Sequence, residues 1–273
     1  MFVITGATGN VGRHLVAELL TRGHRVRAVT RDPAAARLPS EAEAVPFDAL
    51  PLDGATALFV NPAAFWGGLG DLLERAVEER VRRVVLLSSS AALGGGGPGN
   101  PIGAHHLDLE ERVAATGLEW TFVRPGAFAA NTLGWAGQIR ADGVVRGPYA
   151  RAAIASIHER DIAAVAARAL ADDDLVGAKP VLTGPRALTH AEHARLIGEA
   201  IGRPVRYEEI SPGAARAAMT AGRTPPAIAD ALLRMFAAQV DAPGETSPAV
   251  EQIAGRPARP FAAWAADHAG DFR

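Results

Sequence analysis

The chain contains no cysteine, and this absence excludes several kinds of chemistry. Its 273 residues offer no thiol for a disulfide, a thiolate metal site or a cysteine nucleophile. No apolar run approaches the roughly 18–20 residues that span a bilayer, so we expect no membrane-spanning segment. A strand pattern begins at Phe2, which leaves no room for a signal peptide. We therefore expect a soluble, cytoplasmic protein.

Excess charge is also lacking, and lysine is nearly absent. The 28 Lys and Arg residues and the 30 Asp and Glu residues almost balance, and the arginines are scattered along the chain. Neither a nucleic acid nor an anionic membrane surface is therefore expected as a partner. Lys179 is the only lysine, so a mechanism that needs a lysine must use this residue or do without one.

Glycines near the start of the chain form the most informative motif. A β-branched run, Phe2-Val3-Ile4, leads into glycines at 6, 9 and 12, and a helical apolar pattern follows. This strand, turn and helix start would present backbone N–H groups to a pyrophosphate. We expect Gly6 to permit the turn, Gly9 to let the backbone approach the phosphates, and Gly12 to let the helix pack closely. The predicted contacts in this loop are Gly6, Thr8, Gly9, Asn10, Val11 and Gly12.

Strand and helix patterns alternate over the first half of the chain. Strands are expected at 25–30, 44–47, 57–60, 84–87 and 120–123, and helices at 69–79 and 106–115. Beyond residue 126 the alternation stops, and we expect a short strand at 180–183 and helices at 157–170, 189–202, 227–238 and 261–268. The fold class is therefore α/β, with a doubly wound parallel Rossmann sheet and a smaller, mainly helical C-terminal lobe.

The domain boundaries follow from the same pattern. Residues 1–130 are expected to form the Rossmann domain, with 154–171 packing back on it. Residues 131–153 and 172–273 are expected to form the smaller lobe over the carboxyl edge of the sheet, where ligands bind in such folds.

The end of the second strand indicates which nicotinamide cofactor binds. In NAD-binding proteins an acidic residue at this point accepts hydrogen bonds from the ribose 2′-OH. Here Thr30-Arg31 occupies the position, and a guanidinium suits a 2′-phosphate. Arg13 is a second candidate contact. We predict NADP(H), with NADPH preferred over NADH. Asp32 keeps NADH as an alternative, and both arginines could equally be solvated surface charges.

Longer segments resemble the NmrA-like family, a branch of the atypical short-chain dehydrogenases. The segments are 5–12, 30–33, 110–126, 128–131, 160–163 and 182–185, and the resemblance extends over nearly the whole chain. The resemblance implies an NADP(H)-binding Rossmann domain, a smaller lobe and a cleft between them. It also implies cofactor contacts at Asp48 near the adenine, Asn61 and Pro62 near the nicotinamide ribose, Ser88 after the fifth strand, and Arg124, Pro125 and Gly126 beside the nicotinamide.

The tyrosine–lysine pair of active short-chain dehydrogenases is missing. Its positions, counted back from Glu110 and Gly117, fall on Ile102 and His106. Reduction of a simple ketone should then be slow, because the alkoxide needs an acid or an oxyanion donor. A quinone needs less help, because its phenolate product is already stabilised.

The absence of the tyrosine–lysine pair favours an acceptor that needs little acid catalysis. We predict an NADPH-dependent oxidoreductase that passes hydride to a quinone or another conjugated, flat acceptor. The alternatives are a regulator that senses the NADP+/NADPH ratio without turnover and a non-redox enzyme of secondary metabolism.

Other residues are candidates for a supporting chemical role. His106 could protonate an oxyanion near neutral pH, and since His105 points about 100° away, we expect one of the two to face the cleft. Ser89 or Ser90 could donate a hydrogen bond to the substrate oxygen, although a serine run can also simply end a strand.

Scarce aromatic residues suggest the shape of the substrate. The predicted substrate contacts are Phe65, Trp66, Phe128, Asn131 and Trp135, which would suit an aromatic or quinone-like molecule, with lobe packing as the alternative reading. His190 and His193 could suggest a metal site, but Thr189 and Glu192 form a capping box, the spacing is not His-Glu-x-x-His and a third ligand is missing, so no metal is expected. The oligomeric state stays open, with a homodimer as one option.

Overall fold

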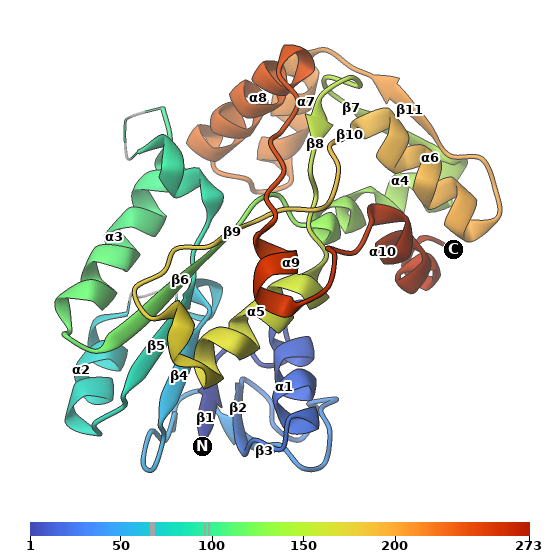
Figure 1. Cartoon of the computed structure of the whole chain (residues 1–273). Helices are drawn as coiled ribbons and strands as arrows, with labels where there is room; N and C mark the ends of the chain where they lie inside the picture. Colours follow the sequence, from blue (N-terminus) through green and yellow to red (C-terminus); the bar gives the residue numbers. More distant parts are fainter. Residues whose placement is uncertain (66–68, 96, 98) are drawn as a thin grey trace.

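A parallel sheet forms the centre of the protein. The structure is a computed structural model that describes residues 1–65, 69–95, 97 and 99–273. Within these residues the main sheet has seven strands in the order β3-β2-β1-β4-β5-β6-β9, and every neighbouring pair is parallel (Figure 1). The strands are β1 (Phe2–Ile4), β2 (Val26–Thr30), β3 (Glu43–Pro46), β4 (Ala57–Val60), β5 (Arg83–Leu87), β6 (Glu119–Pro125) and β9 (Val181–Leu182).

Helices cover both faces of this sheet, because its strands are apolar on both sides. On β5, Val84 and Leu86 pack into one core, and Val85 and Leu87 pack into the other. The first core is closed by α2 (Gly70–Glu78) and α3 (Pro101–Ala115), and the second by α1 (Gly12–Thr21), α5 (Glu159–Ala171) and α9 (Ala249–Ala254) (Figure 1). The predicted doubly wound α/β fold is confirmed.

The order of the strands determines where a ligand can bind. From β1 the chain continues to β2 on one side, whereas β4 lies on the other side of β1. The loops that follow β1 and β4 therefore diverge and leave a crevice at the carboxyl edge of the sheet. Thr5 joins these loops, since its Oγ1 donates to Phe59 O at 2.9 Å and accepts from the Asn61 amide at 2.9 Å.

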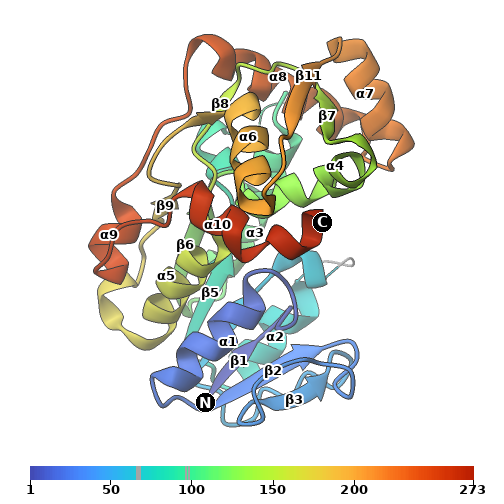
Figure 2. The same ribbon diagram turned by 90° about the vertical axis from the view of Figure 1, so that its right-hand side faces the viewer.

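The smaller lobe has its own core around the fully buried Trp264 and lies over this edge of the sheet (Figure 2). Its helices are α4 (Ala136–Asp142), α6 (His190–Ile201), α7 (Pro212–Ala221), α8 (Pro226–Asp241) and α10 (Phe261–Asp267). Its strands form two small pairs, β7 (Val144–Gly147) with β11 (Arg206–Glu209), and β8 (Ala153–Ile154) with β10 (Leu188–Thr189). Short 3₁₀ helices lie at Pro62–Ala64, Ser90–Gly94, Ala129–Trp135, Asp173–Leu175 and Ala269–Phe272.

The structure differs from the predicted boundaries in two places that matter for the site. First, β9 and α9 lie within 172–273, the range assigned to the lobe, but β9 pairs with β6 and α9 packs against α5. A two-residue strand carries no sequence signal of which sheet it joins. Second, α3 begins at Pro101 rather than at residue 106, because the Asn100 side chain accepts from Gly103 N and Pro101 takes the first helical position.

Several lobe elements had no counterpart in the prediction, namely α4, α7 and the short strands β7, β8, β10 and β11. In the part of the chain that the structure describes, no helix combines the length and the apolar character that crossing a membrane requires.

Candidate active site

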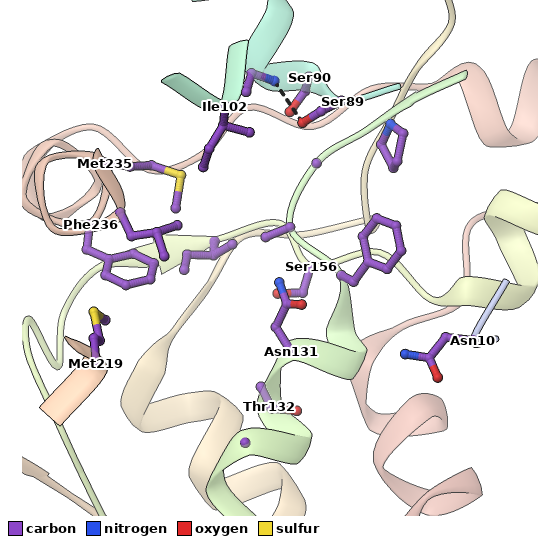
Figure 3. Close-up of a pocket in the computed structure, with 18 of the residues that line it drawn as sticks. Asn10, Ser89, Ser90, Ile102, Asn131, Thr132, Ser156, Met219, Met235 and Phe236 are labelled. Atoms are coloured by element: carbon purple, nitrogen blue, oxygen red, sulfur yellow. Dashed lines mark hydrogen bonds between the residues drawn. The ribbon is translucent and has the colours of Figure 1, made fainter. Parts of the chain in front are cut away.

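A cleft of about 1620 Å³ lies between the carboxyl edge of the sheet and the smaller lobe. It begins at the loop after β1 and extends to α7 and α8. Figure 3 shows Asn10 on one side of the pocket and Met219, Met235 and Phe236 on the other, with Ser156 between them. The predicted site residues that line the cleft are Gly9, Asn10, Val11, Asn61, Pro62, Phe65, Ser88, Ser89, Ser90, His106, Pro125, Gly126, Phe128, Asn131 and Trp135.

The glycine turn is tight and packs closely against the start of α1. Gly6 has φ +63°, which a side chain rarely adopts, and a Cβ on Gly12 would lie 2.2 Å from Gly6 O. These close contacts bring the start of α1 against the turn. The N-cap residue Val11 makes no side-chain cap hydrogen bond, and it lines the cleft at the start of α1. In the first turn Arg13 N donates to Gly9 O at 3.2 Å and His14 N donates to Val11 O at 3.1 Å. Such a helix end attracts an anion such as a diphosphate.

The predicted contacts for the 2′-phosphate, Arg13 and Arg31, lie outside the lining of the cleft. Thr8 Oγ1 is 3.5 Å from Thr30 Oγ1, which joins the turn to the end of β2, where Arg31 is exposed. Asp32 Oδ1 accepts from Ala35 N at 3.1 Å and is occupied in its own turn. Arg13 is exposed and donates to Asn10 Oδ1 at 2.9 Å.

Asp48 is a predicted cofactor contact that does not line the cleft. It is exposed, and its Oδ1 accepts from the adjacent Ala49 N at 3.1 Å. Its role near the adenine stays a prediction.

A buried ionic network lies directly behind the cleft. Glu110 on α3 accepts from Ser88 Oγ at 2.6 Å and from Arg124 Nε at 2.8 Å and Nη2 at 2.5 Å. Burial alone would raise the pKa of Glu110, but the hydrogen bonds from Arg124 and Ser88 outweigh it and the pKa is lowered. The Arg124 guanidinium is thus bound to Glu110 and does not line the cleft, whereas Pro125 and Gly126 do. The place of this segment beside the nicotinamide stays a prediction.

The candidate hydroxyls and imidazoles lie on one wall of the cleft. Ser89 Oγ accepts from Ala91 N at 3.2 Å, which leaves its own proton available, and Ser90 is half-buried beside it (Figure 3). Both His105 and His106 line the cleft, contrary to the expectation of one, because α3 presents a broad face along Ile102, His105 and His106.

The protonation state of His106 differs from the expectation. Burial, together with the neighbouring His105, lowers the pKa of His106 to about 4. The imidazole is therefore neutral at pH 7, and His106 is not the near-neutral acid that the sequence suggested.

The four predicted substrate contacts that the structure describes, Phe65, Phe128, Asn131 and Trp135, all line the cleft. Phe65 lines the cleft and also packs on Phe47, at a ring-centroid distance of 5.0 Å. Trp135 lies edge-on to His190 at 6.0 Å, and Asn131 is exposed to the cleft. Trp66 lies outside the described residues.

His190 and Tyr207 of the smaller lobe also line the cleft, and neither was predicted as a site residue from the sequence. His190 is buried, and its Nδ1 is 3.1 Å from Tyr149 O and 3.3 Å from Pro148 O. Carbonyl oxygens only accept, so Nδ1 carries the proton; burial lowers the pKa of His190, and the neutral ring keeps Nε2 as an acceptor. The Tyr207 hydroxyl donates to Pro148 O at 2.9 Å, and burial raises the pKa of Tyr207.

His193 lies one turn further along α6 and also lines the cleft. Its Nδ1 is 2.9 Å from Thr189 O, and burial lowers its pKa to about 4. The capping box of Thr189 and Glu192 is confirmed. The sequence could have indicated that His190 and His193 are buried, because residues 190, 193, 194 and 197 have the spacing of one buried helical face.

Comparison with known proteins agrees with this architecture. The chain is 36% identical to a (4-alkanoyl-5-oxo-2,5-dihydrofuran-3-yl)methyl phosphate reductase of Streptomyces griseus, over 100% of this chain and 99% of that protein. It is 34% identical to an NAD(P)H azoreductase of Xenophilus azovorans, over 100% of this chain and 99% of that protein. An NADPH-dependent quinone oxidoreductase from Escherichia coli has the same fold, with a TM-score of 0.79 at 24% identity, covering 98% of this chain and 99% of that one. A family model described as NAD(P)H-binding matches residues 6–173, and the chain belongs to this NAD(P)H-binding family, in agreement with its NmrA-like motifs.

Proposed function

We propose that this protein is an NADPH-dependent oxidoreductase that reduces a quinone or another conjugated, flat acceptor without a tyrosine–lysine pair. Two relatives that match the whole chain are named as reductases, which supports the reaction class. The observation that carries the proposal is the continuity of the cleft, which runs from the glycine turn to a chamber in the lobe. A substrate in that chamber would lie beside the cofactor.

The chain offers a fitting set of groups for the cofactor. The glycine turn and the first turn of α1 would hold the diphosphate, and Asn61 and Pro62 would contact the nicotinamide ribose. Arg31 would bind the 2′-phosphate, because it is exposed at the end of β2 and a guanidinium suits a phosphate. When bound, NADPH supplies the hydride.

The side chains around the reacting centre favour an acceptor that stabilises its own negative charge. Lys179 Nζ lies 3.8 Å from Glu110 Oε2, behind the cleft, so it does not assist a tyrosine in the site. His106 is neutral and supplies at most a hydrogen bond. The hydroxyl of Ser89 or Ser90 would donate to the developing oxyanion, and water would complete the protonation of the product.

A regulator that only reads the redox state of the cofactor is the competing function. Such a protein needs no space beyond the cofactor, whereas this cleft continues past His106 to α8. We therefore favour the enzyme.

Two measurements on the purified protein test the proposal. The first follows the loss of NADPH absorbance after addition of a quinone, an enone or an azo dye, and the second measures calorimetric dissociation constants for NADPH and NADP+. Rapid NADPH oxidation with at least one acceptor is expected. Equal affinity for both redox forms without oxidation of NADPH by any acceptor would establish the regulator instead. A product formed without net NADPH consumption would establish a non-redox enzyme.

A further inference from the structure

The end of the cleft furthest from the glycine turn is built by two helices that bury little of themselves elsewhere. Along α7 only Ala215 is buried, and along α8 only Ala229 and Leu233. Their cleft-lining residues are Ala215, Ala218 and Met219 on α7 and Leu232, Met235 and Phe236 on α8. Both sets have the spacing i, i+3, i+4, so each helix turns one apolar face toward the cleft.

This chamber continues the proposed reaction site rather than forming a separate pocket. In Figure 3 Met219, Met235 and Phe236 gather on one side, while Ser89 and Ser90 lie nearer the middle and Asn10 on the far side. The cleft volume of about 1620 Å³ includes the part that would hold the cofactor, and the same cleft continues from Ser89 and Ser90 to α7 and α8. A molecule reacting beside the serines would therefore have room to extend toward α7 and α8.

The chemistry of the chamber indicates what extends into it. Its six helical residues carry no charge and no hydrogen-bonding side chain. The nearby cation Arg146 is already paired with Asp142 at 2.9 Å and with Glu208 at 3.6 Å, so it offers little attraction to an anion. Methionine side chains adapt their shape to the molecule they contact. These properties favour a flexible apolar chain over a charged group.

We propose that the chamber of α7 and α8 is a subsite for an unbranched alkyl or acyl chain on the electron acceptor. The proposal rests on the proposed function, because it assigns the part of that acceptor remote from the reacting atoms. Burial of the alkyl or acyl chain would stabilise the ground state and the transition state alike, so it would raise kcat/KM and lower the dissociation constant of the acceptor.

A homologous series of quinones tests the subsite, with one headgroup and n-alkyl chains from none to long. We expect kcat/KM to rise about threefold to fourfold per buried methylene until the chamber is full. In the variant Ala218→Trp the indole should occupy the chamber and remove this rise. Ala217→Trp is the matched control, because Ala217 is exposed on the same helix and does not line the cleft. The control should retain the dependence on chain length.

A binding measurement separates this proposal from the reductase proposal. Alkylhydroquinones of the same series are titrated calorimetrically into the protein saturated with NADP+. A dissociation constant that falls with chain length, in the absence of any turnover, would support the subsite while overturning the reductase. Turnover and dissociation constants that do not vary with chain length would overturn the subsite and leave the reductase intact. Identical chain dependence in Ala218→Trp and Ala217→Trp would also overturn it.

Discussion

Replacing Glu110 with glutamine should destabilise the protein strongly although the two side chains have the same size. Glu110 is buried and accepts three hydrogen bonds, one from Ser88 and two from the equally buried Arg124. In Glu110→Gln an amide N–H₂ group would meet donors, and the Arg124 charge would remain buried without a counterion. Lys179, 3.8 Å away, would add to the uncompensated positive charge.

The magnitude follows from the burial of the pair. Removing one partner of a buried ion pair costs about 3–5 kcal/mol. For a chain of this length each kcal/mol lowers Tm by about 2–4 °C, so we expect a fall of about 6 °C or more. The folded-state pKa of Glu110 is lowered, so its stabilising effect is present above the unfolded-state pKa and lost as the pH falls through the folded-state value. The difference between wild type and variant should therefore shrink in acid.

Urea unfolding at neutral and acidic pH measures the effect. Asp108→Asn is the matched control on α3, since Asp108 pairs with Arg112 at the surface and should change stability by less than about 1 kcal/mol. The double variant Glu110→Leu/Arg124→Leu should recover much of the lost stability, because apolar replacement of a whole buried pair is often nearly neutral. A Glu110→Gln protein within about 1 kcal/mol of wild type would refute this reasoning.

Three further predictions concern the cofactor site and the imidazole of His106. Gly12→Ala should lower the stability by about 1–3 kcal/mol and weaken NADPH binding, because the new Cβ would lie 2.2 Å from Gly6 O. The control Gly137→Ala, whose Cβ would have no neighbour within 4 Å, should be harmless. Equal urea midpoints for the two variants would contradict this prediction. Arg31→Ala should weaken the binding of NADPH about 5- to 30-fold, since an exposed charge-assisted hydrogen bond contributes about 1–2 kcal/mol. Calorimetry should show an unchanged affinity for NADH. An equal loss of affinity for both cofactors would disprove the assignment. His106→Ala should change kcat/KM by the same factor throughout pH 6–8, because a pKa of about 4 keeps the imidazole neutral in this range. If the ratio of wild-type to variant kcat/KM changes with pH and has a midpoint near 6.5, the prediction is wrong.

The sequence predicted features that depend on local periodicity. The glycine turn, the alternation of strands and helices, and the capping box at Thr189 are encoded within a few neighbouring residues. The environment of Arg124 is not encoded in this way, because its partner Glu110 lies on a different element and only folding shows that both are buried together. The lowered pKa of His106 likewise depends on burial in the folded protein, beside His105.

The lobe wall was missed for a related reason. His190 was considered as a metal ligand and as part of a helix start, although its helical spacing with His193 placed both on a buried face. The faces of α7 and α8 are short apolar patterns whose partner is an open chamber rather than a core, and a sequence pattern does not distinguish these two partners.

The pairing of β9 with β6 has a consequence for exchanging parts between relatives. The family match ends at residue 173, before the three backbone acceptors that complete the outer edge of β6. The amides of Phe122, Arg124 and Gly126 donate to the carbonyl oxygens of Ala178, Pro180 and Leu182 at 3.0, 2.9 and 2.8 Å. A chimera joined at residue 173 would take this strand from the donor protein, so the graft would alter the scaffold of the nucleotide site as well as substrate choice. A junction beyond residue 184 would keep all seven strands native, and of the elements that cover the sheet only α9 would come from the donor protein.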